Sequence, residues 1–207
     1  MDLKDIPFIV YAEETPNPAS VKFVANKLIL VSGATADYEP SGAGKDAPLA
    51  ARLFSFPFVK RVFFASNYIT VTKHDHVEWE EIRDELRVFI TNYLNSSEPV
   101  ILKLPVNEVA KDSSFSDTVK VNTQHVAPKN EVENKIIEVL EQYIRPAVEQ
   151  DGGLITFKEL VDGKVVVQMR GSCSGCPSST MTLKAGIEAL LKRLLPDDVK
   201  EVVSEAV

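Results

Sequence analysis

The sequence predicts an α+β protein made of two small domains joined by a linker, and three observations support this fold class. Short runs rich in β-branched and aromatic residues occur together with longer segments whose apolar residues recur at helical spacing. Turn signals separate neighbouring short runs, which favours antiparallel or mixed sheets. A stretch without clear periodicity, rich in Pro, Ser and charged residues, divides the two patterned regions. We therefore expect a first domain at 1–97, a linker at 98–129 and a second domain at 130–207.

The composition excludes several classes of protein. A length of 207 residues with 44% hydrophobic content suits one or two packed units. Two cysteines cannot form the disulfide framework of a small secreted fold, and a net charge of -7 argues against binding to nucleic acid. No run of about 18 apolar residues is present, so we expect no membrane span. Acidic residues stand near the N-terminus where a signal peptide needs positive charge, so we expect a cytoplasmic location.

In the first domain, the β-rich runs predict two pairs of strands. The first pair is separated by the turn Pro16-Asn17-Pro18, and the second by Ser66-Asn67. A further strand is expected at 28–31, and the Gly- and Ala-rich residues 32–47 are expected to form a surface loop. The paired strands are expected at 8–12, 21–24, 59–65 and 69–73.

A helix is expected next. Asp75 stands three residues before Glu78, which is the spacing of a capping box. Apolar residues then recur at helical intervals through Trp79, Ile82, Leu86, Phe89, Ile90 and Tyr93.

The second domain begins with a stronger helix-start signal, because Asn130 is followed three residues later by Glu133. Its helix should be kinked by Pro146 and end at Gly152-Gly153. Two strands, 154–160 and 164–169, should form a hairpin around Asp162-Gly163. A second helix is expected from Pro177 to Pro196, with a last strand at 199–203.

Both cysteines of the chain lie in the loop that precedes this second helix. Cys173 and Cys176 are three residues apart. Pro177 fits the first helical position, which would make Cys176 the N-cap and place its sulfur near the positive end of the helix dipole. A thiolate is favoured there, and thiolates bind metals or attack disulfides.

Several functions fit such a pair. A zinc ion or an iron–sulfur cluster wants about four protein ligands, so two copies of the chain or further groups must complete the site. His74 and His76 could complete a Cys2His2 zinc site with Cys173 and Cys176. A thiol-disulfide oxidoreductase needs only the two cysteines, although its usual βαβ context is missing. The pair could also be structural or without a role.

The residues around the cysteines resemble a known family. The run Tyr-Ile-Arg-Pro-Ala-Val-Glu-Gln-Asp-Gly-Gly from Tyr143, followed later by Gly-Ser-Cys-Ser-Gly-Cys-Pro-Ser-Ser to Ser179, is similar to the Nfu domain of NifU-like iron–sulfur proteins. Residues 14–18, 21–23, 49–54, 62–64 and 69–73 resemble the domain that precedes it in many members of the Nfu family.

The resemblance implies a scaffold or carrier, not an enzyme, that holds a 4Fe-4S cluster between two protomers and passes it to apo-proteins; a 2Fe-2S form is also compatible. Cys173 and Cys176 match the family's ligands. The implied partners are a second copy of the chain, apo iron–sulfur clients and an upstream cluster-assembly scaffold. A thiol-disulfide oxidoreductase and a zinc-bridged dimer remain the alternatives.

Overall fold

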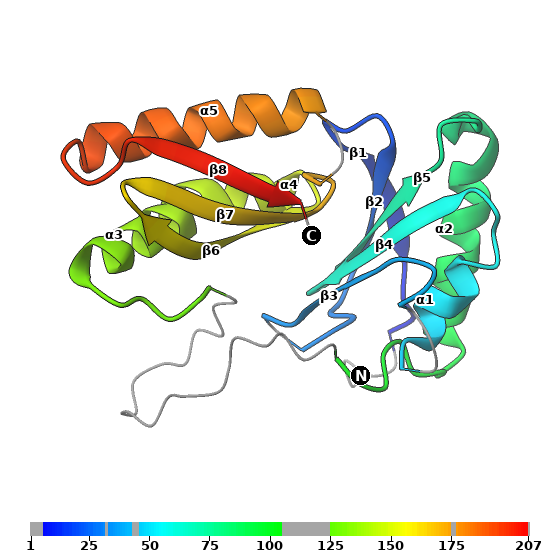
Figure 1. Cartoon of the computed structure of the whole chain (residues 1–207). Coiled ribbons are helices and arrows are strands. Elements are labelled where there is room, and N and C mark those ends of the chain that lie inside the picture. Colours follow the sequence, from blue (N-terminus) through cyan, green and yellow to red (C-terminus); the bar gives the residue numbers. More distant parts are fainter. Residues whose placement is uncertain (1–5, 32, 43–45, 105–124, 175–176, 207) are drawn as a thin grey trace. The chain divides into compact units, whose positions relative to one another are not determined.

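The computed structural model describes residues 6–31, 33–42, 46–104, 125–174 and 177–206. The chain divides into two compact units, residues 1–105 and 106–207 (Figure 1). Each unit combines helices with a sheet, which confirms the predicted α+β class with antiparallel and mixed sheets.

The first unit contains a five-stranded antiparallel sheet. Its strand order is β1-β2-β5-β4-β3, so the two predicted strand pairs come together through β2 and β5. The strands are β1 (Val10–Glu14), β2 (Ser20–Ala25), β3 (Thr35–Tyr38), β4 (Val59–Ala65) and β5 (Tyr68–Lys73).

Two helices, α1 (Pro48–Leu53) and α2 (Trp79–Asn95), cover one face of this sheet (Figure 1). Apolar side chains at every second position of the strands, such as Phe23, Phe64 and Val71, form a buried core with Leu86 and Ile90 of α2. This alternation is what a sheet with one packed face requires.

The structure differs from the prediction between residues 26 and 47. Residues 28–31 do not form a strand: Ile29 and Leu30 donate their N–H groups to the Ser66 carbonyl, and Leu28 and Val31 are exposed. The third strand is instead β3, within the expected loop, where Asp37 binds Arg61 of β4 through both carboxylate oxygens. Ile29 and Leu30 pack against the core, so the apolar run reflects this packing and not a strand.

The capping box predicted for α2 is also absent. The N-cap of α2 is Glu78, and it makes no side-chain hydrogen bond to the first turn. Asp75 therefore lies three residues before the cap. The indole N–H of Trp79 donates to the Pro18 carbonyl at 2.9 Å, which ties the start of the helix to the turn between β1 and β2.

The second unit contains a three-stranded mixed sheet of order β6-β7-β8. Strands β6 (Gly153–Val161) and β7 (Lys164–Gly171) form the predicted antiparallel hairpin, while β8 (Glu201–Ala206) pairs with β7 in parallel. Asp162 and Gly163 both have positive φ, at 52° and 82°. These are the dihedrals of the tight turn that the Asp-Gly pair predicts.

The first helix of this unit is interrupted by a π-helical turn, and its pieces are α3 (Glu131–Val139), η2 (Leu140–Ile144) and α4 (Arg145–Gln150). The side chain of Asn130 accepts from the N–H of Glu133 at 2.8 Å, while Glu133 accepts from the N–H of Lys129, so the predicted start is confirmed. The Arg145 N–H bonds the Leu140 carbonyl, five residues back. Pro146 follows and has no N–H to donate, so the disruption predicted there takes the form of a π turn.

These helical pieces and α5 (Pro177–Leu194) pack against the same face of the sheet (Figure 1). Side chains from both, including Ile136, Leu140 and Ile187, share one buried cluster with Phe157 and Val167. The helices thus cover one face of the sheet, as in the first unit.

The predicted linker at 98–129 is described only at its two ends. On the first unit, the Leu49 N–H bonds the Val100 carbonyl and the Leu102 N–H bonds the Asp46 carbonyl. On the second unit, the Val126 N–H bonds the Phe157 carbonyl. Residues 105–124 lie outside the described ranges. The domain boundaries stay a prediction.

Candidate functional site

The candidate site is the loop between β7 and α5, where both cysteines of the chain lie. Its described part runs from Gly171 to Ser174, and Gly171 has a φ of 67°, in the left-handed region that favours glycine. The Ser174 N–H and hydroxyl both donate to the Gly171 carbonyl, at 3.1 Å and 2.9 Å. The loop therefore turns tightly directly after β7.

The end of the preceding helix holds this loop in place. Gly152 has a φ of 80° and ends α4, after which β6 begins with Gly153 opposite Gly171 of β7. The Gly152 carbonyl accepts from the Ser172 N–H at 3.2 Å, and the Asp151 carbonyl accepts from the Ser172 hydroxyl. Residues 151–153 therefore both end the helix and support the cysteine loop.

Cys173 is a free thiol packed in the core of the unit. It is only 7% exposed and belongs to the same buried cluster as Ile155 and Met169. Its carbonyl accepts a hydrogen bond from the Thr180 hydroxyl on α5 at 3.1 Å. The residue is thus fixed by both the sheet and the helix.

Burial raises the pKa of the Cys173 thiol to about 11. The charge of Asp151 raises this pKa further, whereas a contact with the Ser172 hydroxyl opposes the shift. A thiol with such a pKa is almost wholly protonated at neutral pH, and it gains a charge only when a ligand replaces its proton.

The position of Cys176, including its predicted role as the N-cap of α5, lies outside the described residues. The helix itself begins at Pro177, as predicted. The two-cysteine ligand pair therefore stays a prediction for which the structure describes one member.

The two histidines considered for a zinc site belong to the first unit. The rings of His74 and His76 stack with centroids 5.7 Å apart, while Cys173 belongs to the second unit. Across the described ranges, no three His, Cys, Asp or Glu residues come together as a group suited to a metal ion. No helix in the described part of the chain is long and apolar enough to cross a membrane.

The structure contains one buried polar residue, His125, that the sequence did not indicate. His125 falls within the predicted linker at 98–129, yet the structure buries it against Glu141 and Phe157. No motif surrounds it in the sequence.

Comparison with known proteins matches both units. The family model described as Scaffold protein Nfu/NifU N terminal matches residues 10–97, and the model described as NifU-like domain matches residues 136–203. Two α+β units, the second with a cysteine loop between strand and helix, define the class of NifU-like proteins. The chain belongs to this Nfu/NifU family.

Curated relatives align along nearly the whole chain. NFU1 iron-sulfur cluster scaffold homolog, mitochondrial, of Drosophila willistoni is 35% identical over 95% of this chain, and 64% of that protein is covered. NifU-like protein 4, mitochondrial, of Arabidopsis thaliana is 36% identical over 95% of this chain, with 65% of that protein covered. The chain thus spans slightly less than two thirds of these relatives' length. A solution structure of a NifU-like protein from Saccharomyces cerevisiae is 22% identical over 50% of this chain and 92% of that one, with a TM-score of 0.44.

These relatives correct one expectation. The predicted cytoplasmic location is contradicted, because both relatives are named mitochondrial proteins, which points to the mitochondrion. The prediction relied on the charge of the first residues of this chain. That signal carries no weight for a chain that spans only part of its relatives' length.

Proposed function

We propose that the protein is a scaffold or carrier that binds an iron–sulfur cluster through Cys173 and Cys176 and transfers it to apo-proteins. The observation that supports this most directly is the place of Cys173. It lies at the β7–α5 loop inside the NifU-like match, and the double-glycine turn at 152–153 packs against it. Relatives that align over 95% of the chain are named for an iron–sulfur cluster scaffold or as NifU-like.

The number of cysteines favours a cluster shared by two copies. A 4Fe-4S cluster takes four thiolates, and each chain has two cysteines. Two chains therefore supply the four ligands. Each thiol must release its proton as it binds iron, so loading should liberate one proton per ligand that starts as a thiol.

The alternative oxidoreductase is less well supported by the same residue. An attacking thiol needs solvent access and a lowered pKa, whereas Cys173 is buried and the pKa of its thiol is raised. The proposed function therefore involves no catalytic turnover.

The deciding experiment is anaerobic reconstitution with iron and sulfide, followed by measurement of bound iron, bound acid-labile sulfide and mass. We expect a dimer with four iron and four sulfide per two chains. The variants Cys173→Ala and Cys176→Ala should each lose the cluster. A wild-type chain that binds no cluster, or a monomer that holds one without added thiols, would contradict the proposal.

Two further measurements address the alternatives. Catalytic reduction of a disulfide substrate in metal-free buffer would favour the oxidoreductase. Retention of zinc without sulfide would favour a structural zinc dimer.

We also infer that the first unit docks clients or a cluster donor. If a chain lacking residues 1–97 transfers its cluster to every client at the wild-type rate, that role is excluded.

A further inference from the structure

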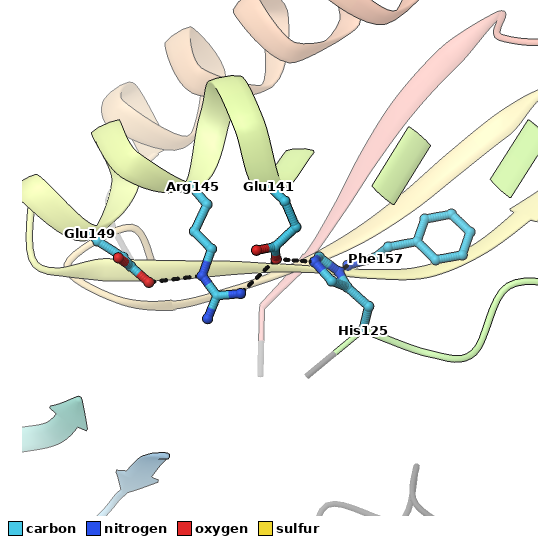
Figure 2. Close-up of polar contacts among 5 residues, drawn as sticks. All are labelled: His125, Glu141, Arg145, Glu149 and Phe157. Carbon is cyan, nitrogen blue, oxygen red and sulfur yellow. Dashed lines mark hydrogen bonds and ion pairs between the residues drawn. The ribbon is translucent and has the colours of Figure 1, made fainter. Parts of the chain in front are cut away.

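His125 is the first described residue of the second unit. It is buried, and both of its ring nitrogens make hydrogen bonds. The His125 side chain is only 2% exposed. Its Nε2 lies 2.5 Å from Glu141 Oε1 on η2, and its Nδ1 lies 2.7 Å from the backbone nitrogen of Phe157 on β6 (Figure 2).

These contacts determine where the imidazole carries its proton. The Phe157 N–H can only donate, so Nδ1 must be an unprotonated acceptor. The single proton of the neutral ring then lies on Nε2 and is donated to Glu141. A second proton, on Nδ1, would point at the N–H of Phe157 and remove that hydrogen bond.

The contact with Phe157 lies on an open edge of the sheet. Strand β6 is the outer strand, and its pairing with β7 shifts register just after Phe157. The Phe157 N–H donates to His125, and the Phe157 carbonyl accepts from the Val126 N–H at 3.0 Å. Residues 125–126 therefore satisfy both backbone groups of Phe157 and cover the edge there.

Burial favours the neutral form of the ring, and Arg145 adds to this effect against the opposing charge of Glu141. Arg145 donates to Glu141 at 2.6 Å and to Glu149 at 2.8 Å, so the carboxylate beside His125 is already paired with a cation (Figure 2). Burial lowers the pKa of His125, the bond to Glu141 partly opposes this, and Arg145 lowers it again.

We propose that residues 125–126 are a pH-sensitive clasp on the outer edge of β6, closed while His125 is neutral and opened when Nδ1 is protonated. The proton comes from solvent, and the bond that breaks is the one from the Phe157 N–H. Opening detaches residues 125–126 from the sheet. It also leaves the Phe157 N–H and carbonyl free for another strand.

The direction of the pH dependence follows from linkage. The detached ring has its ordinary pKa near 6.5, and the docked ring has a lower one. The detached state therefore binds more protons between these values. The clasp is fully stable above about pH 6.5 and loses stability as the pH falls through the lowered pKa.

The test is nuclear magnetic resonance on the full chain, with amide exchange rates corrected for intrinsic pH dependence. Exchange protection at Phe157 and Val126 should fall with the same midpoint as the titration of His125. Protection at Val167, a buried residue of the central strand β7, should not change over that range. If Val167 loses protection together with Phe157, acid unfolds the whole unit and the clasp is refuted.

Two substitutions of His125 distinguish the effect of losing the hydrogen-bond acceptor from the effect of losing the titrating proton. His125→Phe keeps a ring but no acceptor, so Phe157 should exchange roughly fivefold faster or more at neutral pH. His125→Asn restores an acceptor that does not titrate, so the remaining protection of Phe157 should no longer fall below pH 6.5. The matched control His76→Phe removes an exposed imidazole from the first unit and should change neither rate.

Glu141→Gln tests the charge next to the ring. The amide oxygen still accepts from Nε2, but the charge that raises the pKa of His125 is gone. The midpoint for loss of Phe157 protection should therefore move to lower pH. A midpoint that stays in place, or protection at Phe157 that is the same in His125→Phe, would overturn the proposal.

Discussion

Gly153 lies directly against the sulfur of Cys173. A Cβ atom added to Gly153 would stand 2.6 Å from Cys173 Sγ and 3.0 Å from the carbonyl oxygen of Arg170. Real Cβ atoms do not approach other atoms so closely, and one of the two obstacles is backbone. The second glycine of the Gly152-Gly153 pair therefore leaves the space in which Cys173 packs.

Gly153→Ala should displace the cysteine loop. We expect a free energy of unfolding lower by about 1 to 3 kcal/mol, the usual range for overpacking a buried site. Because the displaced atom is a proposed ligand, iron retained after reconstitution should fall as well. The measurements are chemical denaturation of the metal-free chain and iron content after gel filtration.

Gly186→Ala provides the matched control on α5. A Cβ at Gly186 meets no atom within 4 Å, and alanine is the better helix former. This variant should be more stable by up to about 1 kcal/mol and should bind iron as the wild type does. Equal effects of the two substitutions would show that the contact with Cys173 is not what matters.

The thiol of Cys173 should be slow to react in the reduced, metal-free protein. Burial raises its pKa from 9.0 to about 11, so the thiolate fraction at neutral pH is about a hundredfold lower than for an unperturbed thiol. Alkylation of the Cys176→Ser variant, which isolates Cys173, should be slower by at least that factor. The rate should rise about tenfold per pH unit between pH 7 and 9, because the thiolate is the nucleophile.

The same variant in urea supplies the reference rate. Unfolding exposes the thiol and returns its pKa to the ordinary value, so the unfolded variant should react at the rate of an unperturbed thiol. If native Cys173 reacts as fast as the unfolded thiol, the buried position is not the one that the protein adopts in solution.

Arg145 should be sensitive to replacement by lysine. Its Nη1 bonds Glu141 and its Nε bonds Glu149, which a single ammonium group cannot reproduce with the same geometry. Arg145→Lys should therefore lower the free energy of unfolding by roughly 1 to 2 kcal/mol, since hydrogen bonds to charged groups are involved. Arg87→Lys, which alters the exposed pair with Asp84, should have an effect near zero. Comparable losses of stability in both variants would contradict a special role for the buried Arg145 side chain.

Local sequence patterns predicted those elements whose side chains also define the core. The hairpin of β6 and β7 was predictable because Asp162 and Gly163 adopt the positive φ values that their residue types favour. Residues 28–31 misled because Ile29 and Leu30 pack against the core without belonging to a strand, and an apolar run looks the same in both cases. The short strand β3 was missed because Asp37 depends on Arg61, a partner 24 residues away.

The sequence predicts Cys173 and Cys176 as ligands, which stays a prediction, but it does not reveal what supports their loop. The spacing of Cys173 and Cys176 is visible in the sequence, and the resemblance extends to Gly152-Gly153. The contact between Gly153 and Cys173 depends on the register of β6 and β7, which shifts between Phe157 and Glu159 in a way that the turn residues do not predict. His125 was missed for the same reason, because its partners Glu141 and Phe157 are 16 and 32 residues away.

The two helix starts allow a direct comparison of a formed cap with an absent one. Asn130 accepts from the Glu133 N–H at 2.8 Å, so Asn130→Ala should lower the free energy of unfolding of the second unit by about 1 kcal/mol. Asp75 is not the N-cap of α2, so Asp75→Ala should change the first unit by less than about 0.5 kcal/mol.

Each unit needs its own reporter for this comparison. Trp79 is the only tryptophan of the chain and belongs to the first unit, so its fluorescence follows that unit. Amide exchange within α3 follows the second unit. Asn130→Ala should speed exchange in α3 by roughly fivefold without altering the Trp79 transition. A loss of about 1 kcal/mol in Asp75→Ala would instead show that the predicted capping box forms in solution.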